Sequence, residues 1–415
     1  MASYIPRTLT QTIRRAMTTF PAVLITGARQ TGKTTLLRTE FSDTHRYVSL
    51  ERPDVRARAL ADPVAFLAEA GTPLMLDEIR YAPELLHYIK DQIDEDRVPG
   101  RYLMTGSQNF ALMQGASQTL SGRVAVLTLD PLSTGEMMQR LEKGGFDTLL
   151  EKTFGDFSDG RSSSTGQPVD LADWLLRGGF PEPCLNAQVD RCLWFAGYVQ
   201  TYLERDVRDL AQVADLGVFS RFMMLLGARS GSVINMADIG RDVGVTSPTA
   251  KRWLSVLEVS QIVYLLPPYY RNYGKRIRRS PKLYLLDPGL ATFLLGLHTR
   301  ESVLQGPSIG ALAETAVVSE WVKACRQRGE QPGLYYWQSN TQAEVDLIIE
   351  REGRLYGIEV KSTATPPPGH ADGLACWMAL SVPTAHGALA CQIDRPVPLG
   401  QGIKAIPWYV GWFAG

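Results

Sequence analysis

The residues of this sequence that are best suited to chemistry form a short glycine-containing loop near its beginning. An ATP triphosphate carries several negative charges, and backbone N–H groups approach it closely only in a turn built on glycine. Gly27 and Gly32 can form that turn, and a following helix would direct its positive dipole end at the phosphates. Lys33 would reach the β- and γ-phosphates, and the Thr34 hydroxyl would bind Mg²⁺. The predicted ATP-binding set is Gly27, Ala28, Arg29, Gln30, Thr31, Gly32, Lys33, Thr34 and Thr35.

An acidic pair, Asp77 and Glu78, follows the apolar segment 74–76. If that segment is a buried strand, it carries Asp77 to the edge of a sheet beside the glycine loop. Asp77 would then hold Mg²⁺ through water, and Glu78 would act as the general base toward the attacking water. A strand that simply ends in solvated acids has the same sequence, so this prediction depends on the glycine loop. Glu78 and Lys33 are the main catalytic candidates.

Two further polar residues are candidates for the same site. Ser107 follows the apolar segment 102–105 and could sense the γ-phosphate, although capping of its own loop explains it equally well. Arg123 is a candidate arginine finger, supplied by the same chain or by a neighbouring subunit. The alternative for Arg123 is an exposed, solvated side chain.

The elements that would position these residues alternate between apolar strands and helical patterns. Strands are expected near 23–26, 47–50, 74–76, 102–105 and 124–129, and helices over 8–20 and 34–41. Such alternation is typical of a parallel α/β sheet. Residues 143–168 are rich in Gly, Ser, Asp and Thr, which predicts a flexible insertion or linker. Later strands are expected near 334–338, 345–349 and 355–361.

Bulk properties narrow the class of protein. A chain of 415 residues favours two or three domains. Lys and Arg together number 43, as do Asp and Glu, which argues against a wholly basic nucleic-acid coat protein. No stretch has the length and apolar character of a membrane span, and the first residues lack an apolar signal core. Five scattered cysteines without zinc spacing are typical of a reduced, cytoplasmic protein.

Over nearly its whole length the sequence resembles a widespread bacterial and archaeal family of AAA-type ATPases. The matching stretches are 25–34, 76–79, 103–108, 120–124, 177–181, 281–287, 344–346 and 358–361. Members join a P-loop domain to a C-terminal region of unknown function, and they look allied to the origin-recognition and signalling (STAND-like) branch. In that branch a Gly-x-Pro element of the lid packs on the adenine, which implies this role for Pro181. The insertion at 143–168 and the Arg80-Tyr81 pair depart from the family's pattern.

Residues 235–257 have the caps and turn of a helix-turn-helix unit. Asn235 and Ser247 can cap its two helices, and Gly244 supplies the turn between them. Cations on the second helix would face outward, and the basic stretch 271–282, with six cations and no acid, lies where a wing would follow. The alternative is a solubilising loop or a surface for an acidic partner protein. The predicted DNA contacts are Lys251, Arg252, Lys275, Arg276, Arg278 and Arg279.

Near its end the chain has the residue order of a restriction-endonuclease-like, PD-(D/E)xK core. Asp346 is followed one hairpin later by Glu359 and Lys361, which share a face of their strand because they are two residues apart. Asp346 and Glu359 could hold Mg²⁺, Lys361 could orient the attacking water, and Glu314 would be the upstream acidic member. Any half-exposed strand with outward charges looks similar. Because such cores also serve as binding modules, both cleavage and binding stay open.

The sequence therefore predicts an α/β fold class with several domains. These are a parallel-sheet P-loop AAA-type ATPase domain at 1–142, a linker at 143–168, a helical lid at 169–230, a winged-helix domain at 231–300 and a PD-(D/E)xK-like α/β domain at 301–415. The leading interpretation is an ATPase that uses ATP and Mg²⁺ and acts on duplex or branched DNA. The alternative is a nucleotide-dependent switch or scaffold in defence or signalling whose C-terminal domains bind proteins. A homo-oligomer is plausible because AAA-type sites often lie between subunits, and no membrane partner is expected.

Overall fold

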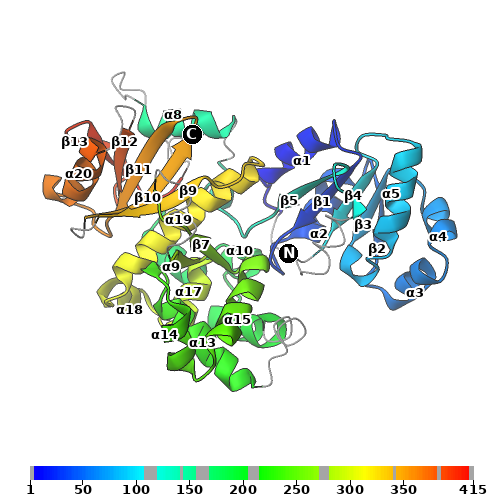
Figure 1. Ribbon diagram of the computed structural model, residues 1–415, viewed down its shortest axis with the longest axis horizontal. Helices are drawn as coiled ribbons and strands as arrows, with labels where there is room; N and C mark the ends of the chain where they lie inside the picture. The colour runs from blue at the N-terminus through cyan, green and yellow to red at the C-terminus, as the bar shows by residue number, and fades with distance from the viewer. Residues whose placement is uncertain are drawn as a thin grey trace.

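The computed structural model describes residues 4–106, 119–140, 144–155, 168–203, 215–270, 280–339, 343–380 and 385–410. Figure 1 shows three parts: a parallel sheet with its helices on the right, a mainly helical part below, and a mixed sheet at the upper left. None of the helices among these residues combines the length and the apolar character needed to cross a bilayer.

The first part is a five-stranded parallel sheet with the strand order β2-β3-β4-β1-β5. The strands are β1 (Ala22–Thr26), β2 (Arg46–Ser49), β3 (Leu74–Asp77), β4 (Tyr102–Thr105) and β5 (Val124–Thr128). Every residue of β1, β3 and β4 is buried, as expected for inner strands covered on both faces. The carboxyl ends of the strands meet at one edge, which confirms the parallel α/β prediction for this part.

Helices cover both faces of this sheet, and two separate apolar clusters lie on its opposite faces. The helices of this part are α1 (Leu9–Met17), α2 (Lys33–Phe41), α3 (Pro53–Ala61), α4 (Pro63–Ala70), the short 3₁₀ helix η1 (Ile79–Tyr81), α5 (Leu85–Glu95) and α7 (Thr134–Met137). A run of alternating strands and helices buries each strand between helices, so the loops that follow the strands come together at the carboxyl edge.

The middle part is mainly helical and contains a small antiparallel sheet, β6-β8-β7. Its helices are α9 (Leu171–Arg177), α10 (Pro181–Leu185), α11 (Arg191–Tyr198), the π-helical segment η2 (Val199–Leu203), α13 (Leu216–Ala228), α14 (Met236–Val243), α15 (Ser247–Val259), α17 (Pro288–Leu294) and α18 (Arg300–Gln305). Its strands are β6 (Ser232–Val233), β7 (Val263–Leu266) and β8 (Lys282–Leu285).

Within this part, α14 and α15 form the expected helix-turn-helix. Asn235 accepts a hydrogen bond from the Ala237 amide, and Gly244 ends α14 in the left-handed region at φ 81°. One detail differs from the prediction. Thr246, one residue before Ser247, is the cap of α15.

The C-terminal part is a six-stranded mixed sheet with the order β13-β14-β12-β11-β10-β9, preceded by the long helix α19 (Ile309–Gln327). Its other elements are β9 (Leu334–Gln338), β10 (Glu344–Arg351), β11 (Arg354–Val360), η3 (Pro368–Ala371), α20 (Asp372–Leu380), β12 (Ala385–Cys391), β13 (Val397–Gly400) and β14 (Ile403–Pro407). The middle and C-terminal parts share one continuous apolar cluster, so the expected boundary at residue 300 does not separate two cores.

The predicted linker 143–168 contains a buried helix, α8 (Phe146–Phe154), and the prediction was wrong for that stretch. Four apolar residues of α8 are buried, and Phe146 and Phe154 contact the Trp321 ring of α19 with centroids 6.1 and 6.5 Å apart. Residues 156–167 lie outside the described residues. The helix therefore packs as part of the C-terminal core, because its apolar face has an aromatic surface to cover.

Candidate functional site

The glycine loop lies between β1 and α2, at the carboxyl edge of the parallel sheet. Gly27 has φ 136°, and a Cβ atom there would lie 2.2 Å from the Leu129 carbonyl oxygen, so the position has room only for glycine. Gly32 has φ 90° and begins α2 as its N-cap. The first turn of a nine-residue helix thus faces the loop, which is the arrangement expected for a phosphate-binding turn.

Lys33 is buried beneath this loop, with 6% of its surface exposed. Its ammonium donates to the carbonyl oxygens of Gly27 at 3.1 Å and Ala28 at 2.7 Å. Burial disfavours the charged form and, although the Glu78 carboxylate opposes this, lowers the pKa of Lys33 to about 8. A buried ammonium held mainly by carbonyl dipoles has capacity for an anion.

Asp77 ends β3 next to the first turn of α2, as the sequence predicts. The Thr34 hydroxyl donates to its two carboxylate oxygens at 3.1 and 3.0 Å. Tyr47, on the neighbouring β2, donates to the same carboxylate at 2.7 Å, and Thr105 at the end of β4 also donates to it. Three hydroxyl groups therefore orient one buried carboxylate beside Thr34, which suits the two residues to ligate a cation jointly.

Glu78 lies at the same edge, and its carboxylate is paired with Arg80. Its backbone is in the left-handed region at φ 56°, and its amide donates to the Thr105 hydroxyl at 3.0 Å. Its carboxylate accepts from Arg80 Nε at 2.7 Å, and both side chains are largely buried. A general base must accept a proton from water, so Glu78 would have to part from Arg80 to act.

A cavity of about 360 Å³ opens beside the loop. It is lined by Gly32 and Thr35, by Tyr4 and Ile5 of the first segment, and by Pro181 at the start of α10. A Cβ atom on Gly32 would lie 3.9 Å from the Pro181 ring, so the loop and the lid helix are in close contact. The cavity matches a flat apolar group such as a nucleobase in size and lining.

Arg7 is a residue of this site that sequence reasoning missed. It is 4% exposed, and it donates to the Thr31 carbonyl at 2.9 Å and to the Asp130 carbonyl at 2.7 Å. It also pairs with the buried Glu136 at 3.1 Å. Arg7 thus fixes the glycine loop to the segment after β5, yet a single arginine in an unpatterned segment gives no signal in the sequence.

One predicted member of the site, Arg123, is not brought to it. Arg123 precedes β5, whose register pairs Val124 with Ala22, so Arg123 lies at the amino edge of the sheet, away from the loop after Thr26. There it pairs with Asp94 of α5. It therefore does not reach the loop of its own chain, and supply to a neighbouring subunit stays a prediction. Ser107 lies outside the described residues.

Comparison with known proteins agrees with this geometry. An AAA domain matches residues 19–138, and two domains of unknown function, DUF8612 and DUF4143, match residues 169–301 and 309–410. Uncharacterized proteins of Mycobacterium tuberculosis and Mycobacterium bovis are 31% identical over 397 residues, which is 95% of this chain and 82% of theirs. The chain belongs to the family of these proteins and is a P-loop ATPase of the AAA type.

Among solved structures, a Walker-type ATPase of Pyrococcus abyssi is similar, with 14% sequence identity and a TM-score of 0.39. That match covers 69% of this AAA-type ATPase and 94% of the archaeal chain.

The C-terminal part of the ATPase gathers the four residues that the sequence assigned to a nuclease-like site. Glu314 on α19, Asp346 on β10, and Glu359 and Lys361 at the end of β11 come together, as do Glu344, Lys282 and Tyr284. We call this set the carboxylate cluster. The Val360 amide donates to Asp346 at 2.8 Å, and Lys361 donates to Glu359 at 2.6 Å.

Burial and mutual repulsion disfavour charge on the acids of the cluster. Burial, reinforced by the Asp346 carboxylate, raises the pKa of Glu314 to about 8 and that of Glu359 to about 7. Burial also raises the pKa of Asp346. Burial alone would lower the pKa of Lys282, but the carboxylates of Glu314, Asp346 and Glu344 outweigh it and raise that pKa. Burial and the neighbouring carboxylates therefore favour the protonated forms of Glu314 and Glu359.

The expected metal at Asp346 and Glu359 does not fit this arrangement. Lys282, which the sequence counted in an exposed basic stretch, is 4% exposed and lies among the acids. It contacts Glu314 at 2.8 Å, Asp346 at 3.8 Å, and Glu344. Within the described ranges no three His, Cys, Asp or Glu side chains converge to hold a metal ion. The fold brings the predicted residues together, but a lysine ammonium stands among them.

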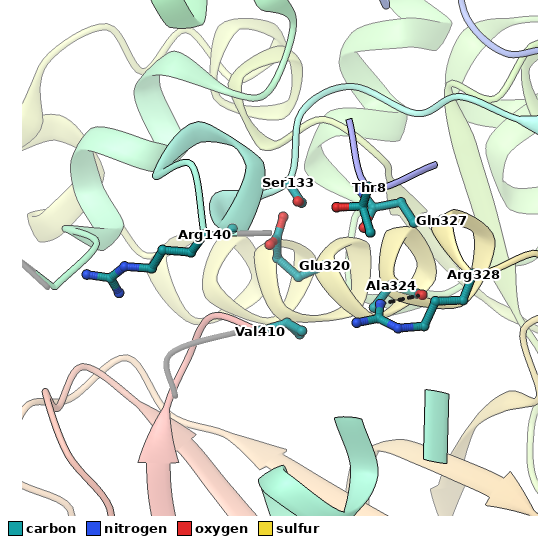
Figure 2. A pocket seen from close by; sticks show the side chains of 9 residues that line it. Thr8, Ser133, Arg140, Glu320, Ala324, Gln327, Arg328 and Val410 are labelled. Atoms are coloured by element: carbon teal, nitrogen blue, oxygen red, sulfur yellow. Dashed lines mark hydrogen bonds between the residues drawn. The ribbon is translucent and has the colours of Figure 1, made fainter. Parts of the chain in front are cut away.

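A buried polar interface joins α19 to the first part of the ATPase. Glu320 accepts from the Thr134 amide at 2.9 Å, and Lys323 donates to the Leu132 carbonyl at 3.1 Å and pairs with Glu320 at 3.3 Å. Figure 2 shows Glu320 pointing from α19 toward Ser133, while Arg328 donates to the Ala324 carbonyl at 3.0 Å. Buried charged groups that are paired in this way favour a single relative position of α19 and the segment around Thr134.

One chain of contacts runs from this interface to the glycine loop. Arg326 of α19 pairs with Asp130 at 2.7 Å, and the Asp130 carbonyl accepts from Arg7. Arg7 in turn donates to Thr31 in the loop. Since α19 also carries Glu314, one rigid helix connects the loop to the carboxylate cluster.

A second connection passes through β8, which begins at Lys282. The strand leads to Asp287, a buried residue that caps α17 and accepts from the Gly179 amide at 2.7 Å. A Cβ atom on Gly178 would lie 2.2 Å from Asp287, so the two segments touch. Gly179 is two residues from Pro181 in the cavity wall, which links the cavity to the cluster.

The predicted DNA contacts are only partly described. Lys251 and Arg252 are exposed on α15, as the helical pattern predicts. Lys275, Arg276, Arg278 and Arg279 lie outside the described residues.

Proposed function

We propose that the chain binds ATP together with Mg²⁺ at the glycine loop and hydrolyses it. The observation that carries this proposal is Lys33, whose buried ammonium donates to two loop carbonyls at the start of a helix. Lys33 would bind the β- and γ-phosphates, and Thr34 with Asp77 would hold the ion. The magnesium ion would neutralise charge that develops on the phosphates. The nucleobase would occupy the cavity next to Pro181.

In this proposal, Glu78 is the general base, and Arg80 keeps its carboxylate paired until nucleotide is bound. The ion pair of 2.7 Å supports a resting arrangement, because a carboxylate engaged by a guanidinium is a weaker proton acceptor. Thr105 stabilises the same turn, because its hydroxyl accepts a hydrogen bond from the Glu78 amide and donates one to the Asp77 carboxylate.

We further propose that ATP hydrolysis drives action on duplex or branched DNA. The exposed cations Lys251 and Arg252 on the second helix of a helix-turn-helix support this, as does the antiparallel pair β7 and β8 that flanks the basic stretch. In a winged helix these elements meet the major groove and the phosphates. The nuclease-like C-terminal part would add DNA binding rather than metal-dependent cleavage, because Lys282 lies among its acids. A neighbouring subunit would supply Arg123 in a homo-oligomer.

A nucleotide-dependent switch is the second candidate, and one observation favours it. The buried contacts from Thr31 through Arg7 and Asp130 to Arg326 tie the glycine loop to α19. A nucleotide that shifts the loop would therefore move α19, and a protein partner of the C-terminal part could respond to that movement.

The two functions are separated by the steady-state ATPase rate, measured alone and with single-stranded, linear duplex and four-way-junction DNA. A DNA-acting ATPase is stimulated by duplex or junction DNA, and the stimulation falls steeply as salt rises. The double variant Lys251→Ala with Arg252→Ala should lose stimulation while its basal rate stays unchanged. Arg58→Ala, which removes an exposed cation of α3, is the matched control. A rate that ignores all three DNAs would overturn DNA action and leave the switch.

A further inference from the structure

Lys282 reaches the carboxylate cluster from outside the C-terminal sheet. It begins β8 in the middle part, whereas the acids around it lie on α19 and β10. Its ammonium contacts three carboxylates, those of Glu314 and Asp346 at 2.8 and 3.8 Å and that of Glu344. Carboxylate oxygens are also the ligands that divalent ions such as Mg²⁺ prefer, so the Lys282 ammonium lies where such an ion could otherwise bind.

Other donors complete this arrangement. Tyr284, two residues along β8, donates to the same Glu314 oxygen that accepts from Lys282. The Val360 amide donates a hydrogen bond to one Asp346 carboxylate oxygen. Glu359 is 9% exposed, and its second carboxylate oxygen has no hydrogen-bond partner among the described residues. One acid of the cluster thus retains an acceptor oxygen without a hydrogen-bond partner among the described residues.

We propose that Lys282 is the resident cation of the carboxylate cluster and excludes divalent ions from it. The inference rests on the proposed nuclease-like nature of the C-terminal part, and it makes metal binding there conditional on removal of the Lys282 ammonium. The chain carries its own counter-ion on β8, which offsets part of the negative charge of the acids without metal. The cluster accepts a divalent ion once that ammonium is gone.

The test is a calorimetric titration of the full chain with Mn²⁺ in the absence of nucleotide. Wild type should bind Mn²⁺ no more tightly than about 1 mM, and Lys282→Met should bind one ion at least about tenfold more tightly. Adding Asp346→Asn to Lys282→Met should abolish this binding. Lys152→Met, which removes an exposed lysine of α8, is the matched control and should behave as wild type.

Two results would overturn the proposal. One is tight Mn²⁺ binding by wild type that Asp346→Asn removes, and the other is a well-folded Lys282→Met that binds no ion. If Lys282→Met is unstable, its melting temperature gives the answer, because Mn²⁺ should raise it while leaving that of wild type unchanged. If it cannot be purified, wild type and Asp346→Asn are titrated side by side, and a difference between them contradicts the proposal. Absence of DNA-stimulated ATPase activity would refute DNA action and leave this result untouched.

Discussion

Lys33 and Lys282 are both buried, yet the atoms around their ammonium groups differ in kind. Lys33 donates to two backbone carbonyls, and its pKa is lowered to about 8 because burial outweighs the nearby acids. Lys282 contacts three carboxylates, and its pKa is raised because those acids outweigh burial. The ammonium group of Lys33 therefore lacks a full negative counter-charge, whereas that of Lys282 is surrounded by carboxylates.

This difference separates a site that needs a ligand from one that has supplied its own. A buried cation without a full counter-charge favours binding of an anion, and a triphosphate provides several charges at once. A buried cation already paired with acids contributes to the folded structure and leaves little attraction for another ion. Lys33 is therefore positioned to bind an anion. Lys282 instead links β8 to α19 and β10 through ion pairs.

The largest expected effect is on stability. Lys282→Met should lower the free energy of unfolding by about 3–5 kcal/mol, because it leaves several buried carboxylates without their cation. Lys33→Met should change it by less than about 1 kcal/mol, since loss of two hydrogen bonds is offset by relief of a desolvated charge. Urea denaturation without nucleotide or divalent ions measures both. Equal losses of unfolding free energy in Lys282→Met and Lys33→Met would contradict the difference described for the two lysines.

A second prediction concerns Glu78, whose carboxylate favours the charged form of Lys33. Glu78→Gln should reduce the ATP turnover number by about 100-fold or more, because it removes the proposed general base. The ATP dissociation constant should stay within about threefold of wild type, since the phosphate contacts are retained. Single-turnover kinetics and equilibrium binding measure the two quantities. Glu84→Gln, an exposed acid at the start of α5, serves as control and should match wild type.

A third, smaller effect is the pH dependence of ATP affinity. Below pH about 8 Lys33 is charged in the free protein and in the complex, so affinity should be constant. Above that pH the free protein loses a proton that the phosphates would keep on Lys33 in the complex. Affinity should then weaken by up to about tenfold per pH unit. Titrations with ATP at pH 7, 8 and 9 test this, and Lys33→Arg, which stays protonated, should give a flat profile.

Sequence reasoning predicted which residues meet at the glycine loop because the determinants of that arrangement are local. The glycines of the loop, Lys33 and Thr34 are consecutive or nearly so, and Asp77 follows an apolar strand whose burial fixes its direction. Arg7 and Tyr47 could not be found in this way. Arg7 acts through backbone carbonyls that only the folded chain presents, and Tyr47 acts across two neighbouring strands.

The C-terminal part shows the converse. The order of Glu314, Asp346, Glu359 and Lys361 was enough to predict that they gather, but not what lies among them. Lys282 ends a basic stretch, so a charge pattern read along the chain places it at the surface. Its burial follows from β8 packing between β6 and β7 against α19, which is a long-range arrangement.

The error at α8 was avoidable. Phe146, Leu149, Leu150 and Phe154 have helical spacing, and this signal was hidden because the surrounding composition is rich in glycine and serine. Composition averaged over a long window concealed a short amphipathic helix, and the apolar spacing within that window was the better guide.

The most direct test of the account is the affinity for ATP of wild type, Lys33→Met and Lys282→Met, measured by calorimetry at pH 7 with Mg²⁺. The account predicts that Lys33→Met loses at least about 100-fold in affinity, while folded Lys282→Met binds ATP as wild type does. Unchanged affinity in Lys33→Met would contradict the assignment of the glycine loop as the nucleotide site.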